Sequence, residues 1–195
     1  MLRPSVYTCV ASVSLLLFGC STTVRGTKKM DDYEQKISSS TIMWQSNPNL
    51  RFQIRKTAGL PSLAAITEPN RQETIENLGK LLQMLTTKSA GAVSGKLRAK
   101  GLFVSELDND APTSPKGYQH LIKVYPDFAG SECSAVNCSH DIGLIVTVWD
   151  FGLKKTVWQG DFKVGAPMGG AVTDKLLENF SSSVVDELQR AKLIE

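Results

Sequence analysis

Two cysteines and a histidine lie close together in a stretch of the chain that is rich in Gly and Ser. Cys133 and Cys138 are separated by four residues, and His140 follows them. A structural zinc ion needs four such ligands, and the chain holds only one further histidine, His120. A disulfide would instead close a short loop and stabilise the fold by roughly 2–3 kcal/mol. We favour a disulfide over free thiols and over a metal site, and a structural role for it over a partner-binding one.

The segment Ser139-His140-Asp141 contains the three residue types of a hydrolase triad side by side. A triad depends on spatial geometry, and neighbouring residues of an extended chain point in different directions. The Gly-x-Ser-x-Gly turn that presents a nucleophilic serine does not occur in the sequence. We expect no catalytic residue and no cofactor, and an unrecognised hydrolase is the least favoured hypothesis. His120 alternates with apolar residues, which is typical of a half-buried strand residue rather than of a catalytic base.

A glycine-rich segment at residues 165–170 lies between a predicted strand and a predicted helix, where phosphate-binding loops occur. The Lys-Ser/Thr pair of such loops does not follow it, and Pro167 removes one backbone N–H donor. We therefore interpret the segment as a flexible loop or as the lip of a binding site. Gly169 and Gly170 are its candidate contact residues.

Trp149 and Trp158 lie in two predicted strands, residues 142–150 and 154–164, which a short turn joins into a hairpin. Large aromatic residues on a sheet usually belong to the core, and we expect this for Trp158. The face of the strand that carries Trp149 has small side chains beside it, which indicates thinner cover. Trp149 is therefore a candidate contact residue.

The remaining periodicities predict three more strands and three helices. Alternating polar and apolar residues indicate strands, and apolar residues three and four apart indicate amphipathic helices. The strands cover residues 50–55, 102–107 and 118–125, and the helices cover residues 70–85, residues 90–100 and a stretch from Asp174 onward. Runs of strands flanked by helices predict an α+β fold. We expect two layers, with a mainly antiparallel sheet of about five strands and with helices packed on one face.

The bulk composition is that of an ordinary globular protein. Of the 195 residues, 42% are hydrophobic and 21% are charged, and the formal net charge is +3. Such a small charge gives no reason to expect nucleic acid as a partner. Beyond residue 20, no apolar run approaches the ~20 residues that a transmembrane helix needs.

The N-terminal segment has the order of parts of a secretory signal. Arg3 precedes an apolar run at residues 10–18, which is too short to span a bilayer. Leu17-Phe18-Gly19-Cys20 then resembles the lipobox of bacterial lipoproteins. The resemblance implies that residues 1–19 are a signal peptide and that Cys20 carries diacylglycerol and usually an acyl chain. In Gram-negative lipoproteins Asp after the Cys favours the inner membrane, so Ser21 implies the outer membrane, facing the periplasm. An uncleaved anchor or a leader cut elsewhere is the alternative.

Polar residues dominate residues 20–49, which predicts a flexible tether between Cys20 and a single folded domain of residues 50–195. The anchor, the tether and the amphipathic C-terminal helix together resemble small Gram-negative envelope lipoproteins. Auxiliary lipoproteins of transport systems and activators of peptidoglycan synthases belong to this class. The resemblance implies a compact periplasmic domain held at the membrane.

Two functions follow from these expectations. The leading hypothesis is a non-enzymatic accessory or scaffold protein, anchored through Cys20, which meets an envelope protein partner at high effective concentration. The alternative is a lipoprotein that binds a small ligand, a lipid or peptidoglycan. It would use the sheet face near Trp149 and the loop at residues 165–170.

Overall fold

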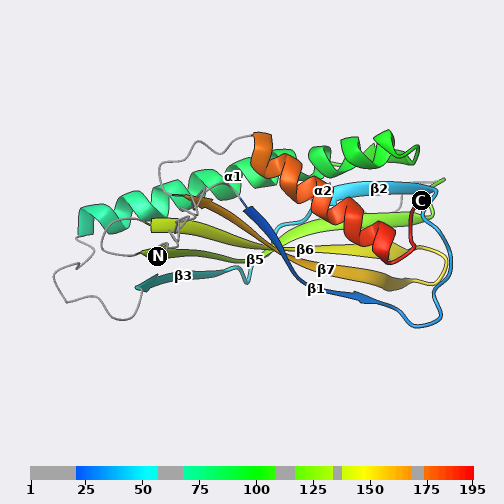
Figure 1. The fold of residues 1–195 in the computed structure, drawn as a ribbon, viewed down its shortest axis with the longest axis horizontal. Helices are drawn as coiled ribbons and strands as arrows, with labels where there is room; N and C mark the ends of the chain where they lie inside the picture. Colours follow the sequence, from blue (N-terminus) through cyan, green and yellow to red (C-terminus); the bar gives the residue numbers. More distant parts are fainter. Residues whose placement is uncertain (1–20, 57–67, 109–116, 134–137, 168–173) are drawn as a thin grey trace, which may run out of the picture.

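The structure is a computed structural model that describes residues 21–56, 68–108, 117–133, 138–167 and 174–195. These residues form seven strands and two helices (Figure 1). The elements are β1 (Ser21–Lys29), β2 (Ser39–Trp44), β3 (Arg51–Lys56), α1 (Glu68–Ala99), β4 (Phe103–Glu106), β5 (His120–Cys133), β6 (Cys138–Asp150), β7 (Lys155–Pro167) and α2 (Asp174–Arg190). The predicted α+β class is confirmed, and the expectation of about five strands is wrong.

All seven strands belong to one mixed sheet in the order β1-β7-β6-β5-β2-β4, and β3 pairs with β5 off this path. The pairs β1–β7, β7–β6 and β6–β5 are antiparallel, whereas β2–β5, β2–β4 and β3–β5 are parallel. The sheet is therefore mixed: its long strand pairs are antiparallel, as expected, and three shorter parallel pairs add to them. The antiparallel hairpin β6–β7 is local in sequence, while the parallel pairs join segments that are far apart.

The structure also corrects the expected tether at residues 20–49, because β1 and β2 are strands of the sheet. The polar composition was misleading for two reasons. β1 is an edge strand with mostly exposed side chains, so it needs few apolar residues. β2 lies inside the sheet, and its hydroxyl residues Ser40 and Thr41 are buried together with Ile42, Met43 and Trp44.

The two helices expected at residues 70–85 and 90–100 form one continuous helix, α1. The residues between them include Thr86 and Thr87, whose hydroxyls donate to the carbonyls of Leu82 and Gln83 within the helix. Neither threonine breaks the helix, and the later glycines weaken it without ending it. Gly101, with φ of 82°, follows the end of the helix as predicted.

β5 is longer than expected, because Pro126 does not end it. The register of β5 with β6 shifts between Pro126 and Phe128, which is a β-bulge. A bulge accommodates a residue that cannot donate to the ladder. Two parallel partners then share one edge of this long strand: β2 pairs with residues 120–124 and β3 with residues 128–133.

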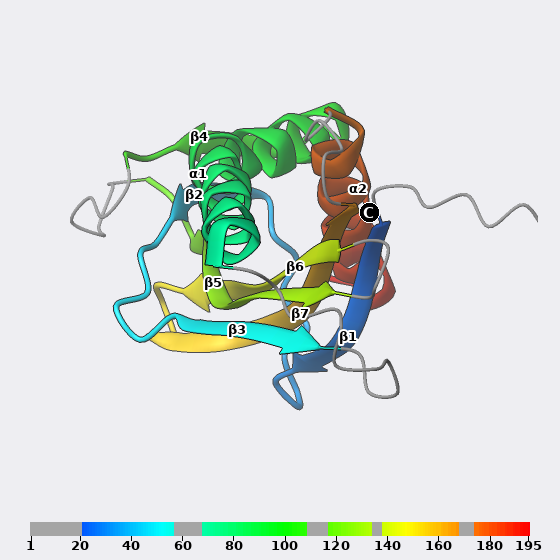
Figure 2. The same ribbon diagram turned by 90° about the vertical axis from the view of Figure 1, so that its left-hand side faces the viewer.

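The core lies between the helices and one face of the sheet (Figure 2). The predicted hairpin and the predicted C-terminal helix are confirmed as β6–β7 and α2. Alternate residues of the hairpin strands face the helices and are fully buried, and Trp158 is among them, as expected. The largest core side chains include Trp44, Trp158, Phe162, Phe180, Leu85 and Leu97.

Candidate functional site

The face of the sheet opposite the helices carries no helix of the described residues. Figures 1 and 2 show α1 and α2 on the same side of the sheet. The uncovered face therefore presents the other alternate residues of each strand, which include Trp149 of β6 and Tyr125 of β5. Both rings are partly exposed, in contrast to the buried rings of Trp44 and Trp158 on the opposite face.

A groove of about 390 Å³ lies on this uncovered face. Three strands supply its floor, and the segment after β2 supplies one wall. Its lining residues are Gln45, Ser46, Asn47, Pro48, Lys123, Tyr125, Thr147, Trp149, Thr156 and Gln159. Most of these side chains end in a hydroxyl, an amide or an ammonium group. The lining includes one charged residue, Lys123, and no carboxylate. We call this hollow the Trp149 groove.

The registers of the strands align the floor of the Trp149 groove in one row across the sheet. Lys28 of β1 is opposite Gln159, Gln159 is opposite Thr147, and Thr147 is opposite Lys123. A second hollow of about 390 Å³ shares Thr156 and Gln159 and reaches Lys28. The row therefore places a lysine at each end, with an amide and a hydroxyl between them.

The two aromatic residues of the groove, Tyr125 and Trp149, lie at different positions along the strand direction. Tyr125 is opposite Ile145, and Trp149 is four residues further along β6 on the same face. Burial raises the pKa of the Tyr125 phenol, and the charge of Asp127 raises it further. The phenol is therefore a neutral hydrogen-bonding group at any ordinary pH.

Backbone and side-chain hydrogen bonds fix the wall formed by residues 45–48. The Gln45 amide donates to the Val124 carbonyl at 2.9 Å, which extends the pairing beyond β2. The Asn47 side-chain amide donates to the Pro126 carbonyl at 2.8 Å, and its oxygen accepts from the backbone N–H of Asn49. The wall is thus held in place before any ligand arrives, which lowers the cost of ordering it on binding.

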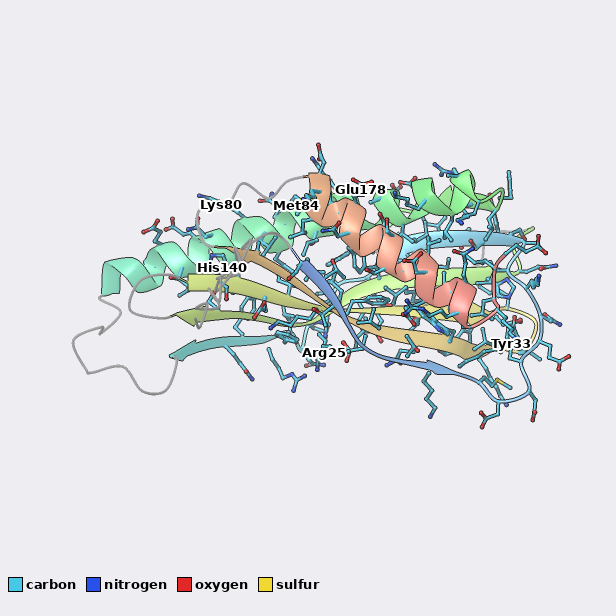
Figure 3. All side chains as sticks on the ribbon, viewed as in Figure 1. Arg25, Tyr33, Lys80, Met84, His140 and Glu178 are labelled. Carbon is cyan, nitrogen blue, oxygen red and sulfur yellow. The ribbon has the colours of Figure 1, made fainter. Side chains whose placement is uncertain are left out.

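A third hollow, of about 330 Å³, lies on the same face, and its charged side chains pair with one another. Each of its three cations contacts an aspartate: Arg25 with Asp161 at 3.6 Å, Arg51 with Asp127 at 3.0 Å, and Lys163 with Asp141 at 2.8 Å. The guanidinium of Arg25 also lies over the ring of Phe128, on the side of the sheet away from Lys80 of α1 (Figure 3). Because the charges are compensated in pairs, this hollow offers little attraction to an anion.

His120 belongs to a buried hydrogen-bond network that also includes Tyr33 and Asp150. The Tyr33 hydroxyl donates to the Asp150 carboxylate at 2.7 Å and lies 2.6 Å from Nε2 of His120. A tyrosine hydroxyl has one hydrogen, so Nε2–H of His120 donates to its oxygen. His120 is fully buried rather than half-buried, and its pKa is lowered by burial despite the charge of Asp150.

Asp150 remains ionised in this network. Burial alone would raise the pKa of its carboxyl, but the backbone N–H of Leu153 and the Tyr33 hydroxyl stabilise the charge and lower it. Burial raises the pKa of Tyr33 strongly, with further contributions from Asp150. The network joins the segment between β1 and β2 to the sheet, and it does not line the Trp149 groove.

The residues of the Ser139-His140-Asp141 segment point apart, as expected from adjacent strand positions. His140 is buried on the helix side of β6, 2.7 Å from the Ser131 hydroxyl (Figure 3). Asp141 faces the other way and pairs with Lys163. Burial lowers the pKa of His140 against the opposing effect of Asp141. This arrangement brings no carboxylate to the imidazole of His140 among the described residues, so it lacks the orienting group of a triad.

The register pairs Cys133 directly with Cys138 at the end of the β5–β6 ladder. Opposite residues of an antiparallel pair have the Cα separation that a disulfide needs. The disulfide itself stays a prediction, as their side chains are outside the described part. Gly169 and Gly170 also lie outside the described residues.

The described ranges lack two further features. No group of three His, Cys, Asp or Glu side chains is placed there to hold a metal ion. No helix within those ranges is long and apolar enough to cross a membrane. Sequence reasoning had named Trp149 but missed Lys123, Thr147 and the wall at residues 45–48. The sequence signal that pointed to this face was the alternation of side chains along the strand of Trp149, which places Trp149 on the face opposite Val146 and Val148.

No family model and no curated protein sequence matches the chain. Among solved structures, PelC from Paraburkholderia phytofirmans, described as a dodecamer, has 10% identity and a TM-score of 0.42, covering 83% of this chain and 93% of PelC. The lipoprotein GNA1162 of Neisseria meningitidis has 13% identity and a TM-score of 0.40, covering 78% of this chain and 99% of GNA1162. The C-terminal domain of LpoB from Salmonella enterica has 15% identity and a TM-score of 0.18, covering 68% of this chain and 85% of that domain. None of these likenesses establishes a family for this chain.

Proposed function

We propose that this chain is a non-enzymatic, lipid-anchored accessory protein of the bacterial cell envelope, which binds a protein partner through the uncovered face of its sheet. The observation that carries the proposal is the Trp149 groove on that face, with its preformed wall and partly exposed rings. The resemblance of residues 17–20 to a lipobox supports the anchor, and Ser21 after Cys20 supports the outer membrane as its location.

The anchor and the site are compatible because β1 begins at Ser21, the residue after Cys20. The lipid would therefore hold the folded domain close to the bilayer, without a long flexible spacer. Local attachment raises the effective concentration of a partner in the same envelope compartment. The protein would thus act by holding its partner near the membrane.

Crosslinking in intact cells tests the proposal. A photo-reactive residue at Thr156, on the exposed rim of the groove, should form a discrete adduct with an envelope protein. The same residue at Lys80, on the exposed side of α1, is the matched control and should give no such adduct (Figure 3). Cys20→Ala should release the protein from the membrane fraction. Equal crosslinking from Lys80 and Thr156 would contradict the proposal. An unanchored Cys20→Ala chain that still forms the adduct in full yield would contradict it as well.

A second candidate function is ligand binding, and the polar lining of the Trp149 groove favours it. Amides and hydroxyls line the floor and the wall of the groove, and convergent polar groups of this kind are what a small polar ligand needs. In the same crosslinking experiment, a ligand-binding role predicts attachment to the cell-wall polymer rather than a discrete protein adduct.

A further inference from the structure

We propose that the Trp149 groove binds a short acidic oligosaccharide, with sugar rings stacked on Trp149 and Tyr125 and a sugar carboxylate paired with Lys123. This inference rests on the second candidate function, ligand binding, and names the class of ligand. It depends on three observations: the spacing of the two rings, the polar groups between them, and the sign of the charge.

The first observation is the spacing of the two aromatic residues. Tyr125 and Trp149 lie on adjacent strands, offset by four residues of β6. With the usual strand spacings, their Cα atoms are about 14 Å apart. That separation is about the length of a di- or trisaccharide. The apolar C–H face of a pyranose ring packs on the negative face of an aromatic ring, so each ring can serve as a platform for one sugar.

The second observation is a set of polar groups between the two rings. Within the described residues, the side-chain amides of Gln45 and Gln159 and the hydroxyl of Thr147 form no hydrogen bond with another side chain or the backbone. Sugar hydroxyls both donate and accept, so they match amides and hydroxyls well. A lipid chain or an apolar peptide face would bury these groups without partners, which costs free energy. The lining therefore favours a saccharide over a lipid.

The third observation is the charge around the row. Lys123 is the one charged residue of the groove lining, and no carboxylate belongs to that lining. Lys28, at the other end of the row, shares its hollow with Asp31, so the preference for an anion depends on Lys123 alone. Asp161 is the carboxylate in the next row, and Arg25 pairs with it at 3.6 Å. The positive charge of Lys123 therefore favours a sugar that carries a carboxylate. The preformed wall at residues 45–48 keeps this arrangement without a ligand.

Intrinsic fluorescence gives a site-specific test. The chain has three tryptophans, and Trp44 and Trp158 are 2% and 1% exposed, so acrylamide quenching reports mainly on Trp149. The probe is a tetrasaccharide of alternating N-acetylglucosamine and N-acetylmuramic acid, and the neutral comparison is a tetramer of N-acetylglucosamine. We expect the acidic tetrasaccharide to protect Trp149 from acrylamide in a saturable manner and to bind about tenfold more tightly than the neutral one.

Variants of the full chain separate the contribution of stacking on Trp149 from that of the charge of Lys123. Trp149→Ala should reduce binding of both sugars at least about tenfold, measured by calorimetry because the fluorophore is lost. Lys123→Gln should reduce binding of the acidic sugar alone, by about tenfold, and remove the preference for it. Lys80→Gln, which removes one exposed lysine from α1, is the matched control and should change neither affinity. Circular dichroism should show that all three variants remain folded.

Two outcomes would overturn the inference: no saturable binding of the acidic tetrasaccharide by the folded protein, or equal binding of both sugars before and after Lys123→Gln. Either outcome leaves the crosslinking result from Thr156 unaffected, so the proposed accessory function can stand while this ligand class is rejected. Conversely, sugar binding that survives Trp149→Ala would place the ligand elsewhere and would also contradict the inference.

Discussion

Tyr33 is buried although the segment around it, between β1 and β2, is mostly exposed. Its hydroxyl lies between the Asp150 carboxylate and the His120 imidazole. The sequence around Tyr33 gives no sign of this role, because both partners are far along the chain. At the residue scale, this tyrosine is the polar link between the first segment of the chain and the sheet.

Tyr33→Phe should lower the free energy of unfolding by about 1–3 kcal/mol, because two buried polar partners lose a hydrogen bond. Urea denaturation of the purified protein measures this change. Tyr118→Phe is the control: Tyr118 stacks on Phe103 and is partly exposed, and no hydrogen bond joins its hydroxyl to a described residue. A loss as large for Tyr118→Phe as for Tyr33→Phe would argue against the network.

Acidification should destabilise the protein through its two histidines. Burial lowers the pKa of His120 and of His140 below the ordinary value of 6.5. The unfolded chain therefore binds more protons than the folded chain once the pH falls below that value. It follows that the free energy of unfolding decreases as the pH falls through the ordinary value and below it. The lowered pKa of the Asp150 carboxyl extends the loss in the same direction at still lower pH.

Denaturation curves over this pH range measure the loss, and NMR of the imidazole signals measures its cause. Both imidazoles of the folded protein should take up a proton at a lower pH than a free imidazole does, because burial lowers their pKa. Two imidazoles that titrate at the ordinary value, together with a flat stability profile, would show that burial does not control their protonation.

At the scale of elements, β2 differs most from its sequence expectation. It lies between β5 and β4, and Ile42 is 0% exposed on the helix side of the sheet. In β3, a predicted strand, Phe52 is by contrast 64% exposed. Ile42, in the segment expected to be a tether, therefore contributes to the core. Phe52, in a strand of the expected domain, does not.

Ile42→Ala should cost about 2–5 kcal/mol, because it removes a fully buried side chain and leaves a cavity. Phe52→Ala is the control and should change the free energy of unfolding by less than about 1 kcal/mol, since little area is buried there. Thermal and urea unfolding measure both. If Ile42→Ala were as mild as Phe52→Ala, residues 39–44 would be behaving as the tether that the composition suggests.

At the scale of the whole molecule, the position of β1 in the sheet decides which end of the sheet a lipid on Cys20 would hold near a membrane. Ser21 pairs with Gly165, and β1 then runs to Lys29, opposite Trp158. Nine strand residues span about 30 Å. If Cys20 carries the lipid, the Ser21 end of β1 lies at the bilayer, and the end of the sheet near Tyr33 points away from it (Figure 3).

Quenching by spin-labelled lipids tests this orientation in vesicles that carry the lipidated protein. A genetically encoded fluorescent residue at Thr23, which is exposed near the start of β1, should be quenched strongly. The same residue at Asp31, exposed beyond the end of β1, should be quenched little. Equal quenching at both sites would mean that the sheet lies flat on the bilayer or that the anchor is elsewhere.

Elements with local signals could be predicted from the amino-acid pattern alone. The alternation around Trp158 predicted β6 and β7 as a hairpin, and the apolar spacing after Asp174 predicted α2. Hydrophobic periodicity and helix caps depend on residues that are close together in the chain, so they can be recognised in the sequence. The outward position of Trp149 in its strand was readable for the same reason.

The way in which these elements combine could not be predicted in this manner. The parallel pairing of β2 and β3 with the two halves of β5 depends on registers between distant segments, which local composition does not encode. The groove residue Lys123, the wall at residues 45–48 and the Tyr33 network come together through those registers. A polar strand such as β1 looks like a linker in sequence, because the partner that satisfies its backbone, β7, lies far along the chain.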